Sequence, residues 1–330
     1  SHPFSEIGFD YDIPMLEANF VTKKEGTGIV HCAPSHGSDD FNLCLKNNIK
    51  AEETVDDDGK YTKHVPSFEG IHIFKANKII IEKLKEQKKL LANGELIHSY
   101  PHSWRSKAPL VHRATLQWFI SMESHGLRNK ALKAIDETKF YPNKGKERLK
   151  SMIELRPDWC VSRQRAWGVP IPVFLSKKTN EILLDDEVTE NIASIFEKEG
   201  ADCWFEGDAQ RFLGKKYKSK DYNKLTDIVE VWFDSGSTHS YVLEKRKDLK
   251  WPASMYLEGS DQHRGWFHSS LLESCGTRGR APFDSILSHG FVVDGKGLKM
   301  SKSLGNIISP EDILKKYGAD ILRIWVAASD

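Results

Sequence analysis

The sequence predicts an α/β fold in which helices alternate with the strands of a parallel sheet. Three short apolar runs carry this prediction, and each ends in a polar loop that contains glycine: residues 228–233, 253–258 and 284–293. Helical stretches follow the second and third runs, which is the pattern of strand–helix–strand units. Because ligands of open α/β sheets bind at the carboxyl ends of the strands, the three loops are expected on one edge.

The composition limits the class of protein. The chain has 330 residues, 39% hydrophobic and 29% charged, which is typical of a globular protein of about two or three domains. The net charge of +1 means that any contact with nucleic acid must come from a local patch. The five cysteines form no CxxC pair, so neither a disulfide framework nor a cysteine zinc site is expected. We expect a cytoplasmic location, since no apolar run reaches membrane-spanning length and no signal peptide is recognisable.

The first hundred residues have mixed α/β character. Residues 26–34 form a short apolar run between turn signals and predict a strand. Residues 38–48 predict a helix with Ser38 as its N-cap and acids in the first turn. Residues 56–61 predict a turn, and the periodicity of residues 75–93 predicts a second helix.

The middle of the chain is less regular. Residues 130–159 are rich in lysine and predict helix in pieces. Residues 176–226 are polar and charged, which indicates an insertion or a surface subdomain. Near the end, residues 309–318 predict a helix with Ser309 as N-cap, Pro310 at the first helical position and Asp312 completing a capping box.

A lysine loop, residues 296–306, follows the last predicted strand. Lys299 and Lys302 are three residues apart, accompanied by the hydroxyls of Ser301 and Ser303 and flanked by glycines. Two ammonium groups on a flexible backbone suit a loop that closes over a polyphosphate. The alternative is a solvated basic turn, which is common on protein surfaces.

The loop after residues 253–258 is also polar. Glu258, Asp261, Gln262 and His263 could bind an ammonium group, a ribose or a phosphate. The alternative is a helix start with Ser260 or Asp261 as N-cap. Both interpretations are compatible with each other.

Two further groups of residues leave alternatives open. Arg163 and Arg165, with Trp159 and Trp167, could contact nucleic acid or simply tie a connector to the sheet. Trp232 lies in a predicted strand, where an aromatic residue belongs to the core or to a pocket. A cluster of two histidines and two aspartates at residues 31–40 resembles a metal site but lacks a defined ligand set, so no metal is predicted.

Six segments together resemble a known family. KMSKS at residues 299–303 matches a signature of class I aminoacyl-tRNA synthetases, and the other segments narrow the resemblance to the isoleucyl-tRNA synthetases of the bacterial type: residues 26–41, 98–110, 156–172, 231–240 and 256–267. Valyl and leucyl synthetases share KMSKS and an editing insertion, so a relative of that kind is an alternative. A truncated, non-catalytic tRNA-binding paralogue is another.

The resemblance implies a division of the chain. Residues 1–97 would be the C-terminal part of an editing domain and residues 98–160 a connector. Residues 161–330 would be the second half of a Rossmann-type catalytic domain, with the insertion at about 176–226. Because the family's HIGH-type motif is absent, the resemblance implies a fragment that is inactive alone. The cysteine zinc ligands of some relatives are also absent, so no zinc is predicted.

The resemblance also implies an activity, ATP-dependent formation of isoleucyl-adenylate and transfer to tRNA(Ile), with hydrolytic editing of valine. Partners would be L-isoleucine, tRNA(Ile) and ATP with Mg²⁺; the full-length protein would be a monomer without a membrane contact. The residues implied for each role are catalytic Lys299 and Lys302; ATP-binding Met300, Ser301, Lys302, His289 and Gly290; adenylate-binding Glu258, Gly259, Asp261, Gln262, Trp232 and Trp266; and editing His31 and Asp40.

Overall fold

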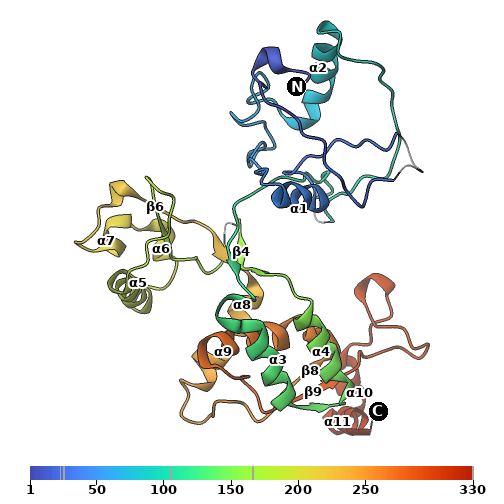
Figure 1. The fold of residues 1–330 in the computed structure, drawn as a ribbon. Coiled ribbons are helices and arrows are strands. Elements are labelled where there is room, and N and C mark those ends of the chain that lie inside the picture. The colour runs from blue at the N-terminus through green and yellow to red at the C-terminus, as the bar shows by residue number, and fades with distance from the viewer. Residues whose placement is uncertain (23, 25–26, 105, 166, 329–330) are drawn as a thin grey trace. The chain divides into compact units, whose positions relative to one another are not determined.

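The computed structural model describes residues 1–22, 24, 27–104, 106–165 and 167–328. The chain forms two compact units, an N-terminal unit of Ser1–Leu116 and a C-terminal unit of Gln117–Asp330 (Figure 1). The boundary between the units lies inside the segment 98–160 that was expected to be a connector. The predicted limits at residues 97 and 160 stay predictions.

The N-terminal unit contains two α-helices, α1 (Ser38–Lys46) and α2 (Ile73–Glu86), and a 3₁₀-helix, η1 (Ser5–Ile7). Its buried centre is aromatic and comprises Phe4, Phe9 and Phe68. Helix α1 confirms the predicted helix, although Gly37 and not Ser38 is its N-cap. Helix α2 begins earlier than predicted, and it also ends earlier because Lys88 adopts a positive φ of 54°.

The strand predicted at residues 26–34 is wrong within the part of that segment that the structure describes. Residues 27–34 form no strand, and Gly26 lies outside the described residues. Ile29 and Val30 are exposed, so the apolar run has no sheet against which to pack. The predicted turn at residues 56–61 is confirmed, since Val55 pairs with Tyr61 across a turn in which Gly59 has a φ of 74°.

A parallel sheet lies at the centre of the C-terminal unit and confirms the α/β class (Figure 1). Its strands are β2 (Lys139–Tyr141), β9 (Ser285–His289) and β8 (Tyr256–Gly259), in that order. Helices α3 (Leu127–Glu137) and α4 (Lys144–Glu154) contact each other, and α3 also contacts α9 (Trp266–Arg278). The largest fully buried members of the shared core are Met122, Ile135, Leu149, Ile153, Phe267, Leu271 and Phe283.

One predicted strand of this sheet is wrong and another strand was not predicted. Within residues 228–233 the strand is limited to Ile228–Val229, β7, which pairs antiparallel with β4 (Ser162–Arg163) outside the parallel sheet. Residues Val231–Gly236 form helix α8 instead. The third strand is β2, whose backbone pairs with β9 although its sequence carries no apolar run.

Residues 174–224 form a small subdomain with its own core, and the insertion expected at about 176–226 stays a prediction. Strands β5 (Phe174–Ser176) and β6 (Tyr222–Lys224) pair antiparallel. They are accompanied by α5 (Asp186–Glu199), α6 (Cys203–Glu206), α7 (Ala209–Leu213) and η3 (Ser219–Asp221). The buried residues of this core are Phe174, Val188, Ile192, Trp204, Phe212 and Leu213.

The predicted helix at residues 309–318 is confirmed as α10 (Pro310–Tyr317). The Ser309 hydroxyl accepts a hydrogen bond from the Glu311 amide, and Gly318 ends the helix. Helix α11 (Ala319–Ala328) follows. The remaining elements are β1 (Phe119–Ile120), which pairs antiparallel with β3 (Trp159–Cys160), and η2 (Ser124–Gly126), η4 (His239–Leu243), η5 (Ser260–His263) and η6 (Lys302–Leu304).

Candidate active site

The carboxyl edge of the parallel sheet brings two of the predicted polar loops together. Glu258 lies opposite Ser288, and Gly259 lies opposite His289, at the ends of β8 and β9. An added Cβ at Gly259 would lie 3.6 Å from His289 Cε1, so the two strand ends are in close proximity. The expectation that these two loops share one edge is therefore confirmed. The third predicted loop, after residues 228–233, falls largely within helix α8, and β7 before that helix is not a strand of this sheet.

The loop of residues 260–265, which follows β8, is tightly packed. His263 is only 1% exposed, and its Nδ1 donates to the Ser260 carbonyl at 2.8 Å. Nε2 faces the start of α4, where an added Cβ at Gly145 would be 3.0 Å away. Burial lowers the pKa of His263.

Helix α9 is not capped by Ser260 or Asp261, so that alternative is wrong. Gly265 precedes the helix, and the first amide of α9 donates to Gln262 Oε1 at 2.9 Å. Asp261 is exposed, and its Oδ2 lies 3.5 Å from the Gln262 amide nitrogen. A Cβ at Gly259 would lie 2.7 Å from Asp261 Oδ1, so a side chain there would require this carboxylate to shift.

The two predicted pocket tryptophans lie near the start of α9. The Trp266 ring stacks on Tyr256 of β8 at 4.0 Å, and its Nε1 donates to the Ser235 carbonyl at 2.9 Å. Trp232 of α8 is 40% exposed and lies so close to Gly265 that an added Cβ there would be 2.8 Å from its ring. Trp266 thus joins α8 to the sheet, while Trp232 keeps an exposed face.

The lysine loop is a local hairpin in which Val293 pairs with Lys299. The Lys299 ammonium lies 3.9 Å from the centre of the Phe291 ring, and Lys302 is exposed at the start of η6. The Ser301 hydroxyl accepts from the Leu304 amide, and both Ser301 and Met300 are partly buried. His289 and Gly290 are exposed where β9 ends, with His289 Nδ1 donating to the Gly290 carbonyl.

Two residues that organise the lysine loop were not predicted. Asp294 Oδ1 accepts from the amides of Lys296 and Leu298 at 2.9 Å each, and Oδ2 accepts from Asn306 Nδ2 at 2.9 Å. The bond from Asn306, followed by those from the amides, lowers the pKa of Asp294. Asn306 also accepts from the Ser301 amide at 2.9 Å, so it closes the loop at its other end. The Asp-x-x-Gly sequence at 294–297 is a turn signal that could have indicated Asp294.

Partly buried acids lie where α8 packs on α9. Burial, assisted by Asp234 and Glu230, raises the pKa of Glu273 to about 9. Burial and Glu230 likewise raise the pKa of Asp234. An added Cβ at Gly236 would lie 2.2 Å from Glu273 Oε1, so the close approach of the helices requires glycine there.

The predicted editing residues lie in the N-terminal unit. His31 is exposed, whereas Asp40 of α1 is partly buried and its Oδ2 accepts from the Ala33 amide at 2.8 Å. Burial, and then Asp40, raises the pKa of the Cys32 thiol beside it. Asp40 therefore fixes the backbone that follows His31.

Among the described residues, no three His, Cys, Asp or Glu side chains form a group that could hold a metal ion. The predicted absence of zinc stays a prediction. In the same ranges, no helix is long and apolar enough to cross a membrane.

Comparison with known proteins identifies the family. A model of the class I tRNA synthetases (I, L, M and V) matches residues 16–330. The chain belongs to this family. This synthetase chain is 81% identical over all its 330 residues to the isoleucine–tRNA ligase of Pelagibacter ubique and 52% identical to that of Gluconobacter oxydans. It spans about 36% of the length of each of these relatives.

A solved structure, that of methionyl-tRNA synthetase from Mycobacterium tuberculosis bound by methionyl-adenylate, is also similar. It is 17% identical with a TM-score of 0.43, covering 70% of this chain and 37% of that one. A likeness at this level assigns no role to any residue.

Proposed function

We propose that this chain contributes the adenylate-forming site of an isoleucine–tRNA ligase. The observation that supports this most directly is the register of β8 and β9, which puts the Glu258 loop and the lysine loop at one edge of a parallel sheet. Isoleucine is proposed as the amino acid because relatives named isoleucine–tRNA ligase match the whole chain at up to 81% identity. tRNA(Ile), L-isoleucine and ATP would be its substrates.

The proposed reaction has two steps. A carboxylate oxygen of isoleucine attacks the α-phosphorus of ATP, and pyrophosphate leaves; a terminal ribose hydroxyl of tRNA then attacks the adenylate carbonyl, and AMP leaves. Lys302 and Lys299 would neutralise the charge that develops on the phosphates, which is electrostatic stabilisation by preplaced cations. Mg²⁺ would arrive with ATP and share that charge. His289, Gly290, Met300 and Ser301 would line the nucleotide side.

The loop after β8 would hold the amino acid and the adenylate. Glu258 is exposed at the strand end, where its carboxylate can pair with the isoleucine ammonium. Asp261 and the Gln262 amide nitrogen would contact ribose and phosphate, with the Gly259 backbone beside them. Trp232 and Trp266 would form the apolar wall for the side chain.

A pyrophosphate-exchange assay on the full-length protein tests the proposal. Isoleucine should give a higher kcat/KM than valine or leucine, and Lys302→Ala should lower exchange about 100-fold or more. Lys316→Ala, an exposed lysine of α10, is the matched control and should change little. Preference for valine or leucine would instead indicate a relative specific for that amino acid. Equal exchange by Lys302→Ala would contradict the role of the lysine loop.

Editing is proposed for the N-terminal unit. In an apolar pocket one methylene is worth only about 1–3 kcal/mol, a value established for isoleucine against valine in enzymes of this kind. A second site that hydrolyses Val-tRNA(Ile) would remove the remaining errors, with Asp40 holding the ammonium and His31 near the ester. Asp40→Ala should abolish deacylation of Val-tRNA(Ile) while leaving pyrophosphate exchange intact.

The 330-residue chain alone is proposed to lack activity, since it spans about 36% of its relatives. Pyrophosphate exchange by the isolated chain, abolished by Lys302→Ala, would contradict this. A cytoplasmic, monomeric full-length protein without a membrane contact is part of the same proposal. Sedimentation of the full-length protein measures the oligomeric state.

A further inference from the structure

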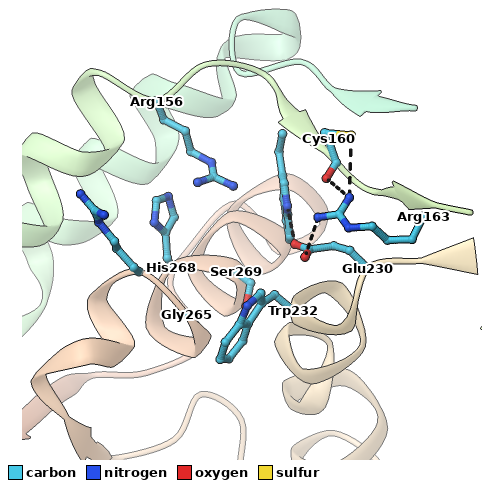
Figure 2. Close-up of a pocket in the computed structure, with 10 residues that line it drawn as sticks. Arg156, Cys160, Arg163, Glu230, Trp232, Gly265, His268 and Ser269 are labelled. Atoms are coloured by element: carbon cyan, nitrogen blue, oxygen red, sulfur yellow. Dashed lines mark hydrogen bonds and ion pairs between the residues drawn. The ribbon is translucent and has the colours of Figure 1, made fainter. Parts of the chain in front are cut away.

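A polar cavity of about 180 Å³ lies beside the start of α9. It is lined by residues from the β3 and β4 segment, from α8 and from the start of α9 (Figure 2). A water molecule occupies about 30 Å³ in the liquid, so the space accommodates several waters or a tetrahedral oxyanion. None of the roles proposed above uses the arginines or the histidine that line it.

The lining is strongly cationic, with the guanidinium groups of Arg156, Arg163 and Arg264 against the single carboxylate of Glu230. Glu230 is already neutralised, since its Oε1 accepts from Trp159 Nε1 at 2.7 Å and its Oε2 accepts from Arg163 at 3.2 Å. Among the described residues, no carboxylate accepts a hydrogen bond from Arg156 or Arg264. The Arg156 guanidinium lies 5.4 Å from the centre of the Trp159 ring, and Arg264 is exposed, so within the described ranges neither charge is paired with a carboxylate by a hydrogen bond.

His268 provides a second, independent observation. Its side chain is only 4% exposed, yet neither ring nitrogen has a hydrogen-bond partner among the described residues. Arg156 Nε is buried and unpartnered as well. Figure 2 shows the Arg156 guanidinium and the His268 ring on one side of the cavity, with Arg163 and Glu230 on the other. Because buried polar groups are normally hydrogen-bonded, these atoms indicate a polar occupant.

The start of α9 adds to the positive electrostatic potential in the cavity. Gly265, the residue before this 13-residue helix, lines the cavity, and the amino end of a helix carries partial positive charge. The neutral imidazole of His268 can donate one hydrogen bond and accept another. Two guanidinium groups, an imidazole N–H and a helix amino end together match the oxygens of a phosphate better than a single carboxylate.

We propose that this cavity binds a phosphate group through Arg156, His268 and Arg264. The phosphate could belong to a single-stranded RNA end or to free phosphate or pyrophosphate. The proposal adds a site to the proposed function and does not depend on the lysine loop.

The test measures binding to the full-length protein in a Lys299→Ala/Lys302→Ala background, which removes the phosphate site proposed at the lysine loop. The probes are radiolabelled phosphate and pyrophosphate in equilibrium dialysis, and a labelled single-stranded RNA tetranucleotide in fluorescence anisotropy. Arg156→Met should weaken binding about tenfold or more, and His268→Leu about threefold to tenfold. Arg246→Met, which removes an exposed arginine elsewhere, should leave binding unchanged.

Comparison of the RNA probe with phosphate and pyrophosphate distinguishes the possible sources of the bound phosphate. If Arg156→Met weakens binding of the RNA probe alone, the site binds a nucleic-acid backbone. The slope of the logarithm of the binding constant against the logarithm of the salt concentration should then fall by about one on removing Arg156. If Arg156→Met weakens binding of phosphate or pyrophosphate, the site binds the free anion. If Arg156→Met does not fold, Arg156→Lys, which keeps the charge but not the planar fork, should still weaken binding. Absence of binding by all probes, or equal binding by Arg156 and His268 variants and the parent, overturns the proposal. Pyrophosphate exchange by the protein with intact lysines separately tests the proposed function.

Discussion

The two loops at the carboxyl edge of the sheet are held in different ways. The 260–265 loop is fixed by the body of the domain: His263 is buried, Gln262 accepts from the first amide of α9, and Trp232 packs on Gly265. The lysine loop is largely exposed, and Asp294 and Asn306 hold it by hydrogen bonds to each other and to nearby backbone.

This difference indicates that the two loops have different functions. A loop fixed to the sheet and to α9 suits the precise placement of an amino acid and an adenylate. A loop whose shape is maintained by its own turn can move as a unit without breaking the core, which suits closure over phosphates. Substitutions on the fixed side should therefore change stability, and substitutions on the lysine side should change activity alone.

The largest effect on stability is expected on the fixed side, at Glu273. Its folded pKa of about 9 lies above its ordinary value of 4.5, because the carboxyl is buried near Asp234 and Glu230. Between those pH values the unfolded chain has released a proton that the folded chain holds, so stability falls as pH rises. At about 1.4 kcal/mol per pH unit, Glu273→Gln should stabilise the protein by about 3 kcal/mol at pH 7.

Urea unfolding, followed by tryptophan fluorescence at pH 5, 7 and 8.5, checks this. The gain from Glu273→Gln should grow with pH and vanish towards pH 4.5. Glu197→Gln, an exposed position on α5, should change stability by less than about 0.5 kcal/mol at each pH. A loss of stability at pH 8.5 in Glu273→Gln would show that the buried group is ionised.

A pair of glycines compares the 260–265 loop with the segment that leads from β9 to the lysine loop. An added Cβ at Gly265 would lie 2.5 Å from Gln262 Oε1 and 2.8 Å from the Trp232 ring, whereas one at Gly290 meets nothing within 4 Å. Gly265→Ala should lower the free energy of unfolding by about 1–3 kcal/mol, because overpacking forces neighbours to shift. Gly290→Ala should change it by less than about 0.5 kcal/mol. Equal unfolding midpoints in urea for the two variants would remove the distinction between the loops.

The elements that the sequence predicted are those with local signals. β8, β9 and α10 were predicted from apolar runs ending in glycine-containing loops and from the cap at Ser309 before Pro310. The 228–233 run was assigned wrongly, since a short apolar run does not distinguish a strand from a helix. β2 was missed because its three residues are extended only through pairing with β9.

The candidate site was predictable only where its residues are close in sequence. Both polar loops are contiguous segments, and the expectation that they meet needed only the parallel order of β8 and β9. The cavity beside α9 brings Arg156 and His268 together from segments far apart in the chain, and no local pattern indicates that they meet. Glu273 was missed for a similar reason: its burial depends on the packing of α8, which was expected to be a strand.

The smallest stability change, with a clear effect on activity, is expected at Asp294. Asp294→Asn keeps the size of the side chain but weakens the charge-assisted hydrogen bonds from two backbone amides. It also replaces the carboxylate oxygen that accepts from Asn306 Nδ2 with part of an uncharged amide group. The exposed loop should then lose order while the sheet is unaffected. KM for ATP in pyrophosphate exchange should rise about tenfold with an unchanged unfolding midpoint. Asp248→Asn, at an exposed pair with Arg246, is the control and should alter neither KM nor the midpoint.

Because Asp294 and Asn306 act through one contact, adding Asn306→Ala should raise KM less than the product of the single effects. A multiplicative double variant would show that the two residues act separately, and a lowered midpoint would show that the lysine loop is part of the core after all.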